Sequence, residues 1–240
     1  MSDPLRGFDP KGTYDAASLD YEQAARDFWE QLSARAVGPG GNVLGVDYAD
    51  QMLALAQEKV TAMGLTNVEL RAGDMTDLEL PPGSFDVVLC VLGLFFVDDM
   101  PGLVRFLWAL LRPGGRLAIT VLGDRFFAPM RDVFVDAVHA ERPGFDVVEP
   151  WRRTEDPETL RVIMTEAGVA ACEIHSEADV LPVESGDWWR IVLGTGLRRT
   201  AMALDPDEAE RARGRCERFM REHDVRQVEL ASHHIIAVGF

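Results

Sequence analysis

Short apolar, β-branched segments alternate with helical segments between residues 43 and 122, and this alternation constrains the fold more than any other feature. Four segments have the composition of strands and two carry apolar residues at helical spacing: the strands are residues 43–46, 68–71, 85–91 and 116–122, and the helices are residues 50–63 and 99–111. Strands joined by helices of this length through short turns are typical of βαβ units. The sequence therefore predicts an α/β fold with a doubly wound, mostly parallel sheet.

The pattern changes on either side of this region. An amphipathic helix is expected at Tyr21–Val37, before the first of these strands. The strand at residues 85–91 is a run of apolar and β-branched residues apart from Asp86, which is typical of a strand covered on both faces. Beyond Gly123 we expect an antiparallel C-terminal strand pair with helical insertions: the helices are residues 129–140, 157–167, 187–202 and 206–222, and the strands are residues 171–181 and 228–238.

The amino-acid composition restricts the classes of molecule that this protein is expected to bind. Forty acidic against 24 basic side chains leave a formal charge of −16, which is the wrong sign for binding nucleic acid or anionic lipid. The longest apolar run, residues 87–97, is about half of what a membrane helix requires. The three widely spaced cysteines are typical of reduced thiols. We therefore expect a cytoplasmic protein with no membrane span.

Polar residues follow the predicted strands at their carboxyl ends, where open α/β sheets bind ligands. Asp47 ends one strand and is followed by Tyr48, and a carboxylate there can accept from both ribose hydroxyls of a nucleoside. Gly73, Asp74 and Met75 follow the next strand. The Asp74 carboxylate suits an exocyclic adenine amine, and Met75 offers a backbone N–H to the ring. The alternatives are local, because Asp47 also suits a helix cap and Gly-Asp is common in turns.

Four motifs in this region resemble those of the class I S-adenosylmethionine-dependent methyltransferases, in particular the ubiquinone and menaquinone C-methyltransferases. They are residues 43–47, 71–75, 85–90 and 111–117, and the resemblance runs from about Tyr14 to Leu122. It implies S-adenosyl-L-methionine as cofactor and methyl transfer to a small, apolar acceptor. It also implies a set of cofactor-binding residues: Asp47, Tyr48, Gly73, Asp74, Met75, Cys90 and, closing over the cofactor, Tyr14.

One motif of that family is missing. Its glycine-rich loop should precede Asp47 by roughly 20 residues, by analogy with the dinucleotide fingerprint, but no glycine occurs between Gly12 and Gly38. The loss of the first strand predicts either a gap between the second and fourth family strands or their direct pairing. Gly38-Pro39-Gly40-Gly41 precedes a strand and predicts a turn, whereas Leu193-Gly194-Thr195-Gly196 predicts a helix break.

This absence keeps two further hypotheses open. The first is a non-catalytic, methyltransferase-like binding or regulatory protein. The second, a nicotinamide-dependent oxidoreductase, needs the same glycine fingerprint and has less support. A homodimer is also compatible with the sequence.

The remaining predictions concern the acceptor side and the domain plan. We expect one domain over residues 1–240, with an N-terminal helical cap (1–37), a cofactor-binding core (38–123) and substrate-side helices and final strands (124–240). Aromatic residues are expected to line the acceptor pocket: Phe28, Trp29, Phe95, Phe96, Phe126, Phe127, Trp188 and Trp189. The catalytic base is unknown, with only His139 and His175 as candidates. We expect no metal, because adjacent His233 and His234 on a strand face opposite sides.

Overall fold

The computed structural model describes residues 37, 38, 40–169 and 171–239. The chain forms two compact units. In the described residues the larger unit contains residues 79–185 and 210–239, and the smaller unit contains residues 37, 38, 40–78 and 186–209. The predicted amphipathic helix at Tyr21–Val37 lies outside the described residues except for its last position. The predicted single-domain plan stays a prediction.

The smaller unit contains a parallel strand pair and a helix between the two strands. β1 (Val43–Asp47) is followed by α3 (Asp50–Ala62) and β2 (Val68–Ala72), and Val43 pairs with Val68 while Asp47 pairs with Ala72. All three elements match the predicted ones. α3 is followed by Gly64, whose φ of +65° favours glycine.

The turn before β1 is a plain turn, as the sequence predicts. The backbone N–H of Gly41 donates to the carbonyl of Gly38 at 3.2 Å. The side-chain amide of Asn67 donates to the carbonyls of both glycines, at 3.1 Å and 2.9 Å. Hydrogen bonds from Asn67, the residue that precedes β2, therefore hold this turn in place.

Two short helices also belong to the smaller unit. α7 (Trp188–Leu193) and α8 (Arg198–Ala203) replace the single helix expected over residues 187–202. The chain leaves α7 at Gly194, and Gly196 follows before α8 begins. Both glycines have low helix propensity, so the helix breaks at the predicted position.

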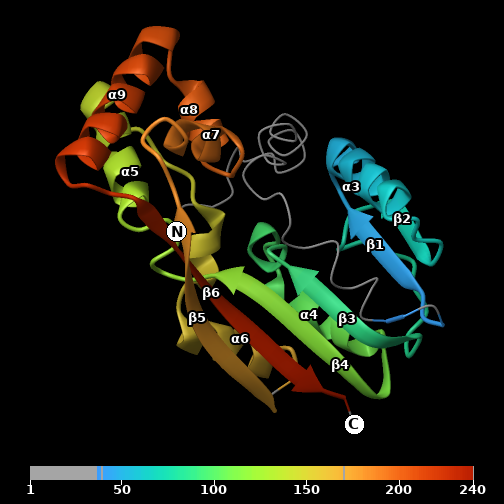
Figure 1. The fold of residues 1–240 in the computed structure, drawn as a ribbon. Helices are drawn as coiled ribbons and strands as arrows, with labels where there is room; N and C mark the ends of the chain where they lie inside the picture. Colours follow the sequence, from blue (N-terminus) through green and yellow to red (C-terminus); the bar gives the residue numbers. More distant parts are fainter. Residues whose placement is uncertain (1–36, 39, 170, 240) are drawn as a thin grey trace. The chain divides into compact units, whose positions relative to one another are not determined.

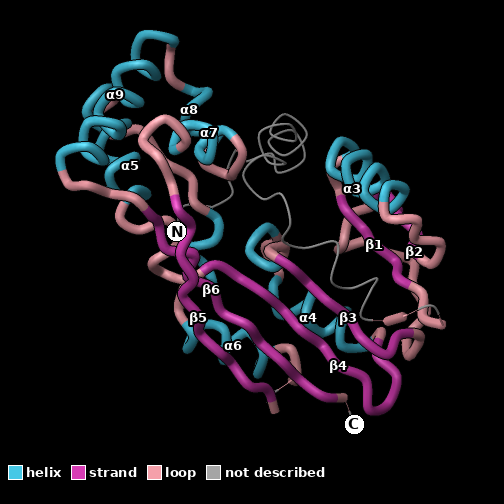
Figure 2. The backbone as a smooth tube through the Cα atoms, viewed as in Figure 1, coloured by secondary structure: helices cyan, strands magenta, loops and turns pink. Residues whose placement is uncertain are grey.

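The larger unit is built on a four-stranded sheet with the order β3-β4-β6-β5. Its strands are β3 (Phe85–Val91), β4 (Leu111–Leu122), β5 (Cys172–Pro182) and β6 (Gln227–Val238). β3 and β4 are parallel, and β6 runs antiparallel to both β4 and β5, which lie side by side with it in Figure 2. The predicted antiparallel C-terminal pair is confirmed.

The chain forms further helical segments between these strands. They are η1 (Leu94–Phe96), α4 (Met100–Ala109), α5 (Met130–Glu141), η2 (Pro150–Thr154), α6 (Pro157–Glu166) and α9 (Pro206–Glu222). α4 and α6 contact each other and cover one face of the sheet (Figure 1). β4 begins at Leu111, five residues before the predicted start, because Leu111 already pairs with Phe85 ahead of a register shift.

The described strands form two sheets rather than one. In the part of the chain that the structure describes, β1 pairs with β2 and β3 pairs with β4. β1 belongs to the smaller unit and β3 to the larger unit, so the gap or direct pairing expected from the missing first strand stays a prediction.

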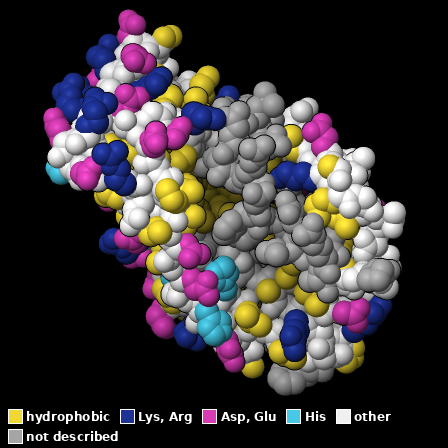
Figure 3. Space-filling model, in the orientation of Figure 1, with side chains coloured by type: hydrophobic (Ala, Val, Ile, Leu, Met, Phe, Trp, Pro, Cys, Tyr) yellow, Lys and Arg dark blue, Asp and Glu magenta, His cyan; other side chains and the backbone are white. Residues whose placement is uncertain are grey.

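The faces of β3 differ in burial. Val88 and Cys90 are buried, whereas Val87, Leu89 and Val91 are 41–50% exposed. The expectation that β3 is covered on both faces is therefore not met within the described residues. Figure 3 shows this face of the sheet, where hydrophobic side chains lie beside a group of His and acidic side chains.

The start of α4 is stabilised by a side-chain cap. Asp99 Oδ1 accepts from the backbone N–H of Gly102 at 2.8 Å, and a side chain at Gly102 would collide with the Asp99 carboxylate. Because this cap satisfies an otherwise unpaired helix N–H, Asp99→Ala is expected to lower the free energy of unfolding by about 1 kcal/mol. Urea unfolding measures the change. Asp98→Ala is the matched control, and an equal loss in both variants would contradict a capping role.

Candidate functional site

The carboxyl ends of β1 and β2 bring the predicted acidic residues together. Asp47 ends β1 opposite Ala72, and Gly73 and Asp74 follow directly. The backbone N–H of Gly73 donates to the Asp47 carbonyl at 3.0 Å, which continues the strand pairing by one residue. Asp47 and Asp74 therefore project from one edge of the same two-stranded sheet, as the sequence predicts.

The Asp47 carboxylate also supports the local chain. Its Oδ1 accepts from the backbone N–H of Ala49 at 2.7 Å, just before α3 begins. The side chain is exposed. This contact is a local turn bond, because the N-cap of α3 is Ala49 and α3 has no side-chain cap hydrogen bond. The helix-cap alternative for Asp47 is therefore not met, and its ligand role stays a prediction.

Asp74 is held by its own turn. Its Oδ1 accepts from both the backbone N–H of Thr76, at 2.8 Å, and the Thr76 hydroxyl, at 2.7 Å. These two contacts fix an exposed carboxylate in one orientation. Met75 is half-buried beside it, and Tyr48 is 51% exposed after β1. A Cβ at Gly73 would lie 3.1 Å from the Leu78 side chain, so the backbone there suits glycine.

Cys90 belongs to the larger unit and is buried near the carboxyl end of β3. Burial raises the pKa of its thiol to about 11, although the backbone N–H groups of Gly93 and Leu94 donate to the sulfur and act in the opposite direction. The thiol therefore stays protonated at neutral pH and is a poor nucleophile. Any contact between Cys90 and a ligand would therefore be a van der Waals contact with the protonated side chain and not a contact with a thiolate.

Two backbone features at this edge of the larger unit have no counterpart among the sequence predictions. Leu92 follows β3 with a φ of +53°, and Phe127 lies beyond β4 with a φ of +63°. Non-glycine residues in this region cost on the order of 1–3 kcal/mol and often occur at functional sites. No sequence signal marks them, because neither residue type favours the left-handed conformation.

The predicted aromatic residues divide by burial. Phe95, Phe127 and Trp188 are buried, and they contribute to the cores of their own units. Three others are half-buried: Phe96, Phe126 and Trp189. The Phe95 and Phe96 ring centroids are 4.6 Å apart, and those of Phe126 and Phe127 are 3.9 Å apart. Tyr14, Phe28 and Trp29 lie outside the described residues.

Both candidate bases have partners in the structure. His139 donates from Nε2 to the carbonyl of Phe145 at 3.0 Å, and His175 Nε2 lies 3.1 Å from Glu173 Oε2. Among the described residues, no group of three or more His, Cys, Asp or Glu side chains is arranged to hold a metal ion.

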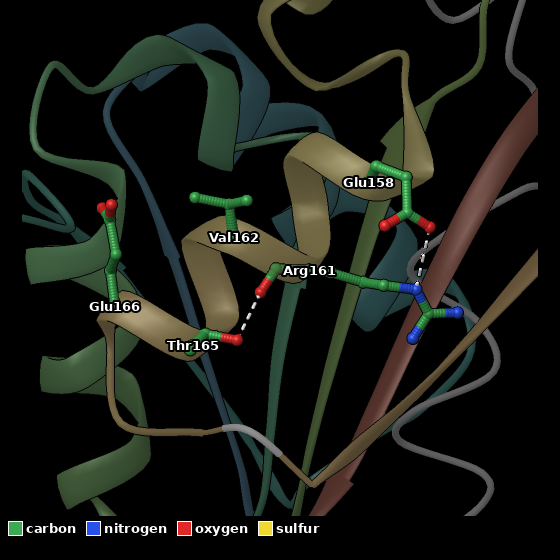
Figure 4. Close-up of a pocket in the computed structure, with 5 residues that line it drawn as sticks. All are labelled: Glu158, Arg161, Val162, Thr165 and Glu166. Atoms are coloured by element: carbon green, nitrogen blue, oxygen red, sulfur yellow. Dashed lines mark hydrogen bonds and ion pairs between the residues drawn. The ribbon is translucent and has the colours of Figure 1, made fainter.

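A surface depression on α6 carries none of the predicted site residues. It is lined by Glu158, Arg161, Val162, Thr165 and Glu166 (Figure 4). The contacts drawn there lie within the helix, with the Arg161 Nε 3.3 Å from Glu158 Oε1 and the Thr165 hydroxyl donating to the Arg161 carbonyl. This depression is a solvated helix face. Over the described residues, no helix has the length and apolar character needed to span a membrane.

Comparisons with known proteins support the resemblance. Residues 27–119 match the methyltransferase-domain family. A demethylmenaquinone methyltransferase of Listeria monocytogenes is 41% identical over 90 residues, which is 38% of each chain. Nocamycin O-methyltransferase of Saccharothrix syringae is 39% identical over 88 residues, 37% of this chain and 31% of that one. These matches span 38% and 31% of the length of the two relatives.

Solved structures share the fold. A protein assigned to the methyltransferases of an antibiotic biosynthesis pathway in Anabaena variabilis has a TM-score of 0.55 at 14% identity, covering 83% of this chain and 91% of that one. Phosphoethanolamine N-methyltransferase 2 of Haemonchus contortus, solved with S-adenosylhomocysteine, has a TM-score of 0.54 at 17% identity, covering 99% of this chain and 59% of that one. Both confirm a Rossmann-like α/β fold.

The fold and the ordered strand-end motifs define a class of protein that binds a nucleoside-containing cofactor at the carboxyl edge of its sheet. Over residues 27–119 the chain is similar to the methyltransferase-domain family, in agreement with the resemblance of its motifs to the class I S-adenosylmethionine-dependent methyltransferases.

The described residues fit one half of the cofactor of this family. Asp47 and Asp74 present two exposed carboxylates at one sheet edge, which suits the hydroxyl and amine donors of a nucleoside. The methionine half of the cofactor lacks the glycine-rich loop that binds it in this family. In the described residues no Gly-x-Gly loop connects the end of a strand to the start of a helix. β1 is followed by Tyr48 and Ala49, and Gly40-Gly41 precedes it.

Proposed function

We propose that this protein transfers a methyl group from S-adenosylmethionine to a small, apolar acceptor. The proposal is carried by the family match over residues 27–119, together with the two carboxylates at the ends of β1 and β2. When bound, the cofactor supplies an electrophilic methyl group. The residues of this chain then bind and orient the nucleoside: Asp47 accepts from the ribose, Asp74 accepts from the adenine amine, and Tyr48, Gly73, Met75, Cys90 and Tyr14 surround it.

For the methyl acceptor, only the chemical class is proposed. The relatives are named as a demethylmenaquinone methyltransferase and a nocamycin O-methyltransferase, so their names do not point to one shared acceptor. The aromatic set of Phe28, Trp29, Phe95, Phe96, Phe126, Trp188 and Trp189 suits flat or lipid-like acceptors. The charge of −16 supports a small molecule rather than nucleic acid as partner. A cytoplasmic location and a homodimer are further parts of this proposal.

A non-catalytic, methyltransferase-like protein is the second candidate. One observation favours it: no glycine occurs between Gly12 and Gly38, so no glycine-rich loop precedes Asp47 at the family's spacing. Titration calorimetry with S-adenosylhomocysteine separates the candidates. Micromolar binding supports the enzyme, and no heat of binding up to millimolar concentration supports the non-catalytic protein.

The Asp47→Ala variant tests the nucleoside site. A hydrogen bond to a charged group contributes roughly 1.5–3 kcal/mol, so the dissociation constant for S-adenosylhomocysteine is expected to rise about 10- to 100-fold. Titration calorimetry measures this change. Asp86→Ala, which removes another exposed strand carboxylate, is expected to leave it unchanged.

The Asp47→Asn variant separates binding from local structure. Its amide oxygen still accepts from the Ala49 N–H, so its stability should stay near that of the parent while binding weakens. If both variants lost stability but bound S-adenosylhomocysteine like the parent, Asp47 would be removed from the site.

A further inference from the structure

A serine and a histidine that are distant in sequence meet in the larger unit. Ser176 on β5 pairs directly with His233 on β6. The Ser176 Oγ lies 2.9 Å from His233 Nδ1. Ser176 is exposed at the edge of the sheet, whereas His233 is only 6% exposed. The pair therefore presents a hydroxyl to solvent with a buried imidazole behind it.

The second ring nitrogen determines which partner donates. His233 Nε2 lies 2.8 Å from the backbone carbonyl of Glu155, just after η2. A carbonyl oxygen only accepts hydrogen bonds, so Nε2 carries the proton. In the neutral ring, Nδ1 then holds a lone pair and accepts from the Ser176 hydroxyl. This is the arrangement of a nucleophile with an oriented general base.

A nearby carboxylate suits the charge that this base would acquire. The pKa of Asp156 is lowered, chiefly by hydrogen bonds from the backbone N–H and hydroxyl of Thr159, and in part by the proximity of His233. Asp156 is therefore ionised at neutral pH, and its charge lies in the vicinity of the His233 ring.

β6 contains a second serine–histidine contact with different chemistry. Ser232 Oγ lies 3.0 Å from His234 Nε2, and His234 Nδ1 lies 3.1 Å from the Thr120 hydroxyl. A hydroxyl both donates and accepts, so it does not determine which nitrogen of His234 carries the proton. Ser232 therefore serves as an internal control for Ser176.

We propose that Ser176 is an activated nucleophile that accepts an acyl group from an activated ester, such as a thioester or an aryl ester. Ser176 Oγ forms a bond to the carbonyl carbon, and the bond from that carbon to the leaving sulfur or oxygen breaks. The hydroxyl proton passes to His233 Nδ1 and then to the leaving group. The products are O-acyl-Ser176 and a free thiol or phenol. None of these residues belongs to the proposed methyl-transfer site.

Acylation of the full-length protein by p-nitrophenyl acetate tests the proposal. Proteolysis and mass spectrometry locate the acetyl group, which distinguishes serines from lysines and the amino terminus. A positioned general base contributes about 10²-fold or more, so Ser176 is expected to react at least 100-fold faster than Ser232 in the same sample. Equal rates at the two serines would overturn the proposal.

Three variants complete the test. Ser176→Ala is expected to remove the fast label, His233→Gln to slow it to the rate of Ser232, and Ser232→Ala to leave it unchanged. Circular dichroism and thermal unfolding check that each variant folds. A folded His233→Gln protein that still labels Ser176 at the parent rate would show that the contact is only structural. If the His233→Gln variant does not fold, the ratio of the acetylation rates of Ser176 and Ser232 in the parent protein tests the proposal by itself.

Discussion

Insertion of a strand, a Gly-x-Gly loop and a helix from an active relative between Ala36 and Gly38 is expected to tighten S-adenosylhomocysteine binding at least about 100-fold. A loop at a helix start brings backbone N–H groups close to the cofactor's carboxylate, an approach that glycine permits. Two such charge-assisted bonds at about 1.5–3 kcal/mol each account for this factor. In the described residues β1 and β3 each pair with a single strand, so an inserted strand finds backbone groups to pair with. Titration calorimetry on both proteins measures the difference.

An insert of the same length with Ala-x-Ala in the loop is the matched control. It restores the strand and the helix but prevents the close approach of the backbone, so it should raise stability without the full gain in affinity. If the parent already binds in the micromolar range and the Gly-x-Gly insert binds equally well, the missing loop is not needed in this protein. That result would contradict our view of the methionine half of the site.

Arg131→Ala is expected to lower the free energy of unfolding by about 3–5 kcal/mol, because it breaks a buried ion pair. Arg131 of α5 donates to both carboxylate oxygens of Glu149, from Nε at 2.7 Å and from Nη2 at 2.6 Å. The side chains are 14% and 6% exposed. The hydrogen bond to Glu149 is the main reason that the pKa of Arg131 is raised. Its removal leaves a carboxylate buried without its cation, and urea unfolding measures the loss.

Arg112→Ala is the matched control, because Arg112 Nη1 donates to both carboxylate oxygens of Asp86, at 2.9 Å and 2.8 Å, in an exposed position. Exposed pairs contribute up to about 1 kcal/mol, so this variant should unfold at nearly the parent urea concentration. The double variant Arg131→Met with Glu149→Leu is expected to recover most of the loss, since it buries no unpaired charge. Similar midpoints for Arg131→Ala and Arg112→Ala would contradict the argument.

Much of the candidate site follows from local sequence. The strands ending at Asp47 and Ala72 are short segments that contain valine and leucine, and parallel neighbours joined by one helix place their carboxyl ends at the same edge. This was sufficient to predict that Asp47 and Asp74 lie together. The division of the aromatic residues was not predictable, because Phe95 and Phe96 differ in burial although they are adjacent. Burial there depends on which elements pack against η1.

The sequence by itself determined the elements and their order, because apolar spacing, caps such as Asp99 and glycines such as Gly64 act within a few residues. Only the tertiary structure decided which strands pair and in what register. Ser176 meets His233 and Arg131 meets Glu149 because of strand register and helix packing that no local pattern encodes. A shift of one residue along β5 would turn Ser176 to the other face of the sheet. The formation of a helix or strand depends mainly on the residues within it, whereas contacts between residues distant in sequence depend on how the whole unit packs.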